Sequence, residues 1–304
     1  MYILRPLLLF ALLLLLSEPN SSALEIGGIR IDDSDQSVKV SKTLGQWRHT
    51  KDGAAIMVPM LNVNFDCGNF NYSIRHDGGG PYPNGLGISY PSRLNWYQSD
   101  GFALLINDQA YASGAGSNEK LELIENGKRA DAVFNWDNDV AALCFDFNVH
   151  YLDQNLYLLI ELKPHIEVHK LKMRLRAFPG GMLPGGKSDL LQVYSNQGEQ
   201  QLQSGKNLQL PPDLNDQILL YRSEDFIEKG IRGGCGVIFS GSKPLSIEIK
   251  NGFFCELILE FSADTRRIGL ALNEFVLSKP LPLFQRQAKL AASRLPDLHI
   301  LNAP

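Results

Sequence analysis

Apolar residues alternate with polar ones along most of this chain, and this period of two is the feature that most restricts its fold. In the segment 140–151, VAALCFDFNVHY, the apolar positions include Ala141, Leu143, Phe145, Phe147 and Val149. Successive side chains of a strand point to opposite faces, so the pattern predicts a half-buried β-strand. A polar turn at 153–155 and a second alternating run at 156–163 complete an antiparallel hairpin.

A second clear unit, 233–261, predicts three strands and ends in FFCELILEF. Asn251 and Gly252 separate two of these strands, which favours a two-residue hairpin turn because both central residues of that turn need positive φ. Phe253 and Cys255 are expected on the apolar face of the third strand. Further strands are expected at 26–31, 37–40, 54–63, 72–74, 101–106, 121–124 and 190–195.

Helix is scarce in this pattern. One or two turns are expected at 223–229, after Ser223 as a cap. A surface helix packed on a sheet edge is expected near the C-terminus, before Pro296, on residues at helical spacing: Leu283, Phe284, Gln287, Ala288, Ala291 and Leu295.

These elements predict an all-β fold, a large two-sheet antiparallel β-sandwich with one short C-terminal helix. We expect a single domain over 24–304, since no segment has the composition of a flexible tether. In size and strand content the chain is similar to the supersandwich domains of sugar mutarotases and some polysaccharide-processing enzymes. None of their motifs can be matched to it residue by residue, and such folds host many functions.

The first 23 residues predict a cleaved signal peptide. Arg5 precedes an apolar run at 6–16, and Ser21 and Ala23 are the small residues that a signal peptidase requires. The alternative is a permanent membrane anchor, which usually needs about 20 apolar residues. Cleavage after Ala23 would leave 281 of 304 residues and remove one charge of each sign, so the net charge stays at −4. We therefore expect a secreted or periplasmic protein, with no membrane contact after cleavage. No nucleic-acid partner is expected, since nucleic-acid binding requires a basic face.

Four cysteines follow this segment: Cys67, Cys144, Cys235 and Cys255. In an oxidising compartment an even number permits two disulfides, with three possible connectivities. The alternative is four buried free thiols, because a chain of this length can bury a large core without covalent links. No CxxC pair occurs, which argues against a cysteine zinc site.

The segment 163–178, KPHIEVHKLKMRLRAF, changes the phase of its alternation near His169. A one-residue slip moves every following side chain to the opposite face, so the segment predicts a β-bulge or sharp bend there. With that bulge, one outward face would carry two histidines and a glutamate followed by three basic residues: His165, Glu167, His169, Lys172, Arg174 and Arg176.

Three interpretations of that face remain open. His165, Glu167 and His169 could bind a metal ion, although a fourth ligand is missing from the sequence neighbourhood. The basic residues, five against one glutamate within 163–176, could bind an acidic polysaccharide. The third interpretation is a solvated strand whose charges keep the sheet soluble.

The segment 75–101 combines glycine and proline with aromatic and polar residues, which predicts a long loop or a set of turns. Aromatic rings can cover the apolar face of a sugar while polar groups bind its hydroxyls. The candidate sugar-binding residues are Tyr82, Tyr90, Trp96, Tyr97 and Asp77, together with Lys172 and Arg176 of the basic face. The alternative is that these rings cover the end of a sheet.

The sequence thus favours an exported protein that binds or processes carbohydrate, with a non-catalytic structural or protein-binding β-sandwich as the alternative. A lyase or isomerase would need a base, with His76, His165 or His169 as candidates, and a cation that stabilises developing negative charge, with Arg93 or Arg174. Hydrolase, zinc-protease and phosphate-loop motifs are absent from the sequence, so no cofactor and no metal site is predicted.

Overall fold

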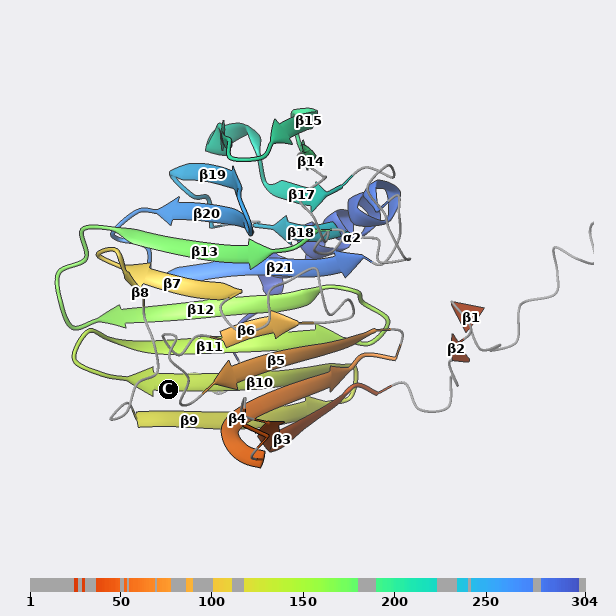
Figure 1. The fold of residues 1–304 in the computed structure, drawn as a ribbon, viewed down its shortest axis with the longest axis vertical. Helices are drawn as coiled ribbons and strands as arrows, with labels where there is room; N and C mark the ends of the chain where they lie inside the picture. The colour runs from red at the N-terminus through yellow and green to blue at the C-terminus, as the bar shows by residue number, and fades with distance from the viewer. Residues whose placement is uncertain are drawn as a thin grey trace, which may run out of the picture.

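Two layers of antiparallel sheet make up the part of the chain that the computed structural model describes (Figure 1). The described residues are 25–26, 29–30, 37–49, 52–53, 55–68, 70–77, 86–89, 101–110, 118–179, 190–222, 234–239, 242–275 and 280–300. Among them the one α-helix is α2 (Leu281–Arg294), followed by a 3-10 turn, η4 (Leu295–Asp297); another 3-10 turn, η2 (Pro212–Leu214), lies between strands. The predicted all-β sandwich with a short C-terminal helix is confirmed.

A nine-stranded sheet forms one layer. Its order is β15 (Gly198–Gln203), β14 (Leu190–Ser195), β17 (Gln217–Tyr221), β18 (Gly234–Ile238), β21 (Arg267–Phe275), β12 (Leu156–Pro164), β11 (Ala141–His150), β10 (Arg129–Asp137) and β9 (Asn118–Asn126). All its neighbouring strands are antiparallel.

Two smaller sheets form the facing layer. The six-stranded sheet has the order β16 (Asn207–Leu210), β19 (Ser246–Asn251), β20 (Cys255–Phe261), β13 (Leu171–Ala177), β7 (Phe102–Ile106) and β8 (Gln109–Ala110). The four-stranded sheet has the order β3 (Lys39–His49), β4 (Ala55–Asp66), β5 (Asn71–Asp77) and β6 (Leu86–Ser89). A separate short pair joins β1 (Glu25–Ile26) to β2 (Ile29–Arg30).

The main hydrophobic core fills the space between the layers. Phe145 and Phe147 of the nine-stranded sheet contact Phe102 of the six-stranded sheet, and Phe147 also contacts Phe134. All four lie in one cluster with Phe65 of the four-stranded sheet. These residues come from the inward positions of their strands, as the period of two predicts.

The nine-stranded sheet is also covered on its outer face, by α2 and the residues that follow it. Phe284, Ala288 and Ala291 of the helix form a second core with outward-facing residues such as Tyr157 and Leu159 of β12. The helix therefore packs on the face of the sheet and not on its edge, because the apolar outward residues of β12, β18 and β21 require a cover.

The phase change near His169 has a different cause from the predicted bulge. β12 ends at Pro164 in the nine-stranded sheet, and β13 begins at Leu171 in the six-stranded sheet. The segment 165–170 crosses from one layer to the other, so each strand keeps its own inward phase. The prediction of one bulged strand is therefore wrong, and His165 and His169 do not share a strand face with Lys172.

Two further sequence interpretations are corrected by the structure. The segment 75–101 is not all loop, since its first residues end β5 and 86–89 form β6. The loop between β19 and β20 has three residues, because Asn251 pairs with Cys255, and Phe253 is 72% exposed instead of facing the core.

Seven of the described strands were not predicted from the sequence: β6, β8, β10, β15, β16, β17 and β21. The other described strands overlap predicted segments, although 26–31 is divided between β1 and β2, and β3 continues beyond the predicted end at Val40 to His49. The short helix expected at 223–229 lies outside the described residues. In the ranges that the structure describes, no helix combines the length and apolarity needed to cross a membrane.

All four cysteines are buried free thiols, which favours the second of the two cysteine interpretations. Burial raises the pKa of the Cys67 and Cys144 thiols to about 12 and that of Cys255 to about 11, and it holds the Cys235 pKa well above its usual value. We expect the folded protein to resist alkylation at pH 8 and to gain four labels after denaturation, as measured by mass spectrometry. Rapid labelling of the folded chain would contradict this packing.

Helix α2 packs close to the sheet at Gly236 of β18. A Cβ at this position would lie 2.0 Å from Asn273 Oδ1 and 2.6 Å from the Phe284 ring. Gly236→Ala should therefore lower the free energy of unfolding by about 1–3 kcal/mol in chemical denaturation, as overpacking does.

Gly269→Ala in the neighbouring strand β21 is the matched control for that substitution. Its Cβ would meet Leu159 at 3.5 Å and Leu295 at 3.8 Å, which are ordinary contacts. We expect this variant to be as stable as the natural chain. If both variants lost the same free energy of unfolding, contact with the helix would not be the reason why Gly236 cannot accept a Cβ.

Candidate functional site

The structure describes about half of the residues predicted to form a sugar site. Five of them lie outside the described ranges: Tyr82, Tyr90, Arg93, Trp96 and Tyr97. The backbone of His76 and Asp77 ends β5. The remaining candidates lie on β13 or on the crossing that precedes it.

His165 and His169 belong to the exposed crossing between the layers, and each is paired with a different carboxylate. His165 Nε2 lies 2.8 Å from Asp137 Oδ1, and His169 Nδ1 lies 3.7 Å from Glu167 Oε1. Asn107 lies at the turn between β7 and β8. Its Oδ1 accepts a hydrogen bond from the His169 backbone N–H, and its Nδ2 donates one to the Glu167 carbonyl. The two histidines are thus parts of separate surface pairs.

The basic residues of β13 face carboxylates on neighbouring elements. Arg176 Nε donates to Glu256 Oε1 at 2.7 Å, and Lys172 Nζ lies 3.5 Å from Glu260 Oε2 and 3.7 Å from Asp108 Oδ1. Arg174 stands between them, opposite Ile258 of β20. The positive charge that the sequence places on this face is largely compensated by acidic residues on β20 and in the β7–β8 turn.

A surface pocket of about 290 Å³ lies at the end of the β19–β20 hairpin. This volume is close to the lower limit of small-molecule sites, about 300 to 1,000 Å³. Its lining combines aromatic, amide and charged side chains with two glycines: Gly205, Asn207, Lys250, Asn251, Gly252, Phe253, Phe254 and Glu256.

Three phenylalanines form an aromatic cluster at this pocket. The Phe178 ring centre lies 4.9 Å from that of Phe254 and 5.8 Å from that of Phe253, and the latter two are 5.0 Å apart. Phe178 is buried, whereas Phe253 remains 72% exposed. The inner rings therefore support an outer ring whose surface faces the solvent.

A buried amide holds the hairpin loop in place. Asn251 Nδ2 donates to the Leu202 carbonyl at 2.8 Å, and Arg222 Nη2 donates to Asn251 Oδ1 at 3.5 Å. Two backbone bonds join the same residue to the turn after β15, from Gly205 to the Asn251 carbonyl and from Asn251 to the Lys206 carbonyl. These contacts fix the position from which the Phe253 and Phe254 rings project.

Arg176 connects the predicted basic face to this pocket. Its guanidinium lies 5.3 Å from the centre of the Phe254 ring while its Nε donates to Glu256, a pocket residue. Of the residues predicted from the sequence, Arg176 is the one that the described structure brings to the pocket. Phe253 and Phe254 were missed because the apolar run FFCELILEF continues directly into β20.

The chemical groups at the pocket are suited to binding. Its lining residues provide exposed ring surface, the Asn207 amide and one carboxylate, Glu256, which is engaged by Arg176. Glycosidic hydrolysis requires two carboxyl groups on opposite sides of the bond, and a second one is not among the described lining residues. Within the described ranges no group of three or more His, Cys, Asp or Glu side chains is arranged to hold a metal ion.

No protein-family model matches this chain, and no curated protein matches its sequence. A TPR-domain containing protein from Parabacteroides distasonis is similar in structure at a TM-score of 0.45 and 6% identity, over 88% of this chain and 57% of that one. The GH36 alpha-galactosidase AgaA from Geobacillus stearothermophilus gives a TM-score of 0.39 and 8% identity, over 70% of this chain and 40% of the enzyme. This chain thus spans 40% to 57% of the length of these proteins, and similarity at this level assigns it neither family nor activity.

The exposure of Phe253 predicts that its ring contributes little to folding. Phe253→Ala should change the free energy of unfolding by less than about 0.5 kcal/mol. Phe178→Ala, which removes the buried ring of the same cluster, should cost about 3–5 kcal/mol. Chemical denaturation of both variants tests this difference, and a similar loss in the two would identify Phe253 as a structural residue.

Proposed function

We propose that this protein binds carbohydrate at the β19–β20 pocket. The observation that supports the proposal most directly is the exposed Phe253 ring, which is held in place by Phe178 and Phe254 beside polar side chains. The ring can cover the apolar C–H face of a sugar, and Asn207 and Glu256 can bind its hydroxyls.

The preferred ligand in this proposal is an uncharged sugar. The positive side chains at and beside the pocket have acidic partners, since Lys250 lies 3.6 Å from Glu248 and Arg176 donates to Glu256. A carboxylated or sulfated glycan would have to compete with these carboxylates for the same cations. The compensated charges therefore favour ring stacking and hydroxyl binding over charge pairing.

An exported location is part of the same proposal. Residues 1–23 have the sequence of a cleaved signal peptide, and cleavage would place the mature chain, 24–304, in a secreted or periplasmic compartment. The pocket would there meet polysaccharides or their fragments.

A glycan array on the mature chain, followed by calorimetric titration with the best-bound oligosaccharide, tests the proposal. We expect selective binding to neutral glycans that changes little between low and high salt, because charge pairing contributes little. Phe253→Ala should weaken the affinity about tenfold or more, which corresponds to about 1.4 kcal/mol.

Leu245→Ala is the matched control, because Leu245 is a second exposed apolar residue, 62% exposed, just before the other end of β19. Its affinity should equal that of the natural chain. A blank array with folded protein would contradict carbohydrate binding and favour a protein-binding role for Phe253. Binding that survives Phe253→Ala would move the site away from this pocket.

A further inference from the structure

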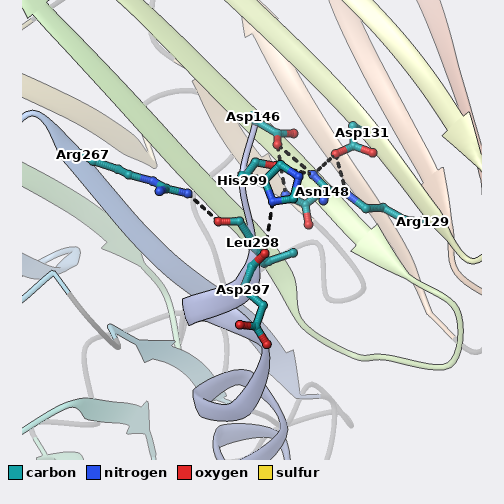
Figure 2. Close-up of polar contacts among 8 residues, drawn as sticks. All are labelled: Arg129, Asp131, Asp146, Asn148, Arg267, Asp297, Leu298 and His299. Atoms are coloured by element: carbon teal, nitrogen blue, oxygen red, sulfur yellow. Dashed lines mark hydrogen bonds and ion pairs between the residues drawn. The ribbon is translucent and has the colours of Figure 1, made fainter. Parts of the chain in front are cut away.

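Two buried aspartates lie diagonally to each other on neighbouring strands, on the outer side of the nine-stranded sheet (Figure 2). Asp131 of β10 and Asp146 of β11 are both 0% exposed. Arg129 Nε donates to Asp131 Oδ1 at 2.7 Å, and Arg129 Nη2 donates to Asp146 Oδ2 at 3.2 Å. One guanidinium therefore serves both carboxyl groups.

The same arginine holds the segment that follows α2. Arg129 Nη2 also donates to the His299 carbonyl, at 3.1 Å, and Arg267 of β21 donates to the Leu298 carbonyl (Figure 2). Leu298 and Ile300 are each only 5% exposed and belong to the core between helix and sheet. The segment 295–300 thus covers the acidic pair and is attached to it through Arg129.

If both aspartates are ionised, two of their buried carboxylate oxygens lack a hydrogen-bond donor among the described residues. Asp131 Oδ2 and Asp146 Oδ1 are buried and find no donor in the described part of the chain. A proton on one of the two carboxyl groups would leave a single buried negative charge for the Arg129 guanidinium to balance. Burial, followed by the charge of Asp131, raises the pKa of Asp146 to about 8, so the pair holds that proton at neutral pH.

The other charged or titratable groups near the pair do not supply the positive charge that would balance a second carboxylate. Burial, followed by the charges of Arg294 of α2 and Arg129, lowers the pKa of His150 to about 3, so that this neighbour on β11 stays neutral. The exposed His299 lies above the pair and lowers the pKa of Asp131 when charged, but burial still raises the Asp131 pKa overall. Burial also raises the pKa of Cys144, which lies two residues before Asp146 on β11, to about 12, so Cys144 remains a thiol.

We propose that the Asp131–Asp146 pair is a pH-sensitive latch for the C-terminal segment 295–300. With one proton bound, the pair and Arg129 are electrically balanced and the segment stays closed. Loss of the proton leaves two buried carboxylates on one guanidinium, and their repulsion and need for water favour displacement of the covering segment. Opening would expose the apolar outer face of the sheet beneath Leu298 and Ile300.

The direction of the pH dependence follows from the raised pKa. Asp146 binds its proton more tightly when the segment is closed than when the carboxyl group is hydrated. In the hydrated state its pKa has the usual value of 3.8. The closed state is therefore most favoured at low pH and loses stability as the pH rises toward about 8. Release of one proton allows the open fraction to increase by up to about tenfold per pH unit in this range.

Hydrogen–deuterium exchange of the full chain between pH 5.5 and 9, corrected for intrinsic rates, tests the latch. Protection of the peptide containing 295–300 should fall with pH and level off above about 8. Asp146→Asn replaces the protonated carboxyl by an uncharged amide, so its protection should be independent of pH. Asp137→Asn, at an exposed aspartate, should retain the natural profile.

Asp131→Asn is a second test that does not depend on the folding of the first variant. It leaves Asp146 as the single carboxylate beside Arg129, which restores charge balance at neutral pH and should also flatten the profile. A flat profile in the natural chain would overturn the latch. The same conclusion would follow if both asparagine variants kept the pH dependence, or if the core strand β12 lost protection in parallel, since the opening would then be global.

Discussion

Burial of the nine-stranded sheet on both faces is the constraint on which the rest of the structure depends. Its inner face packs against two smaller sheets, and its outer face packs against α2 and the segment 295–300. A strand covered on both sides cannot leave its polar groups to water, so most of them need a partner within the protein. The networks around Asp146 and Asn155 are the result, and they lie where β10, β11 and β12 pass beneath the helix and the segment that follows it.

This double burial explains where the sequence was informative and where it was not. The alternation of apolar residues predicted the sandwich and most of its strands, because the inner core is strictly apolar. The polar positions Asp146 and Asn148 read as a solvent-facing side, yet both are 0% exposed. A single strand does not reveal what covers it. The C-terminal helix carried the missing information, since its apolar side requires a surface on which to pack.

The candidate site was predictable only in part, for two physical reasons. A shift in the phase of alternation arises both from a bulge and from a crossing between sheets, so the segment around His169 could not distinguish them. The second reason is that the loop between β19 and β20 contains phenylalanines, which favour strands. Asn251 and Gly252 marked the place of the hairpin, but Asn251 belongs to β19 and neither residue has the positive φ of the predicted two-residue turn. The third loop residue, which follows the exposed Phe253, could not be recognised from composition.

The four buried thiols have a consequence for how the fold can be produced. The structure closes its core without a covalent link, because each cysteine occupies an apolar position and remains reduced. Folding therefore requires neither an oxidant nor a disulfide isomerase. The chain should reach the same structure in a reducing bacterial cytosol as in an oxidising compartment, and reducing agents can be kept in every buffer without loosening it.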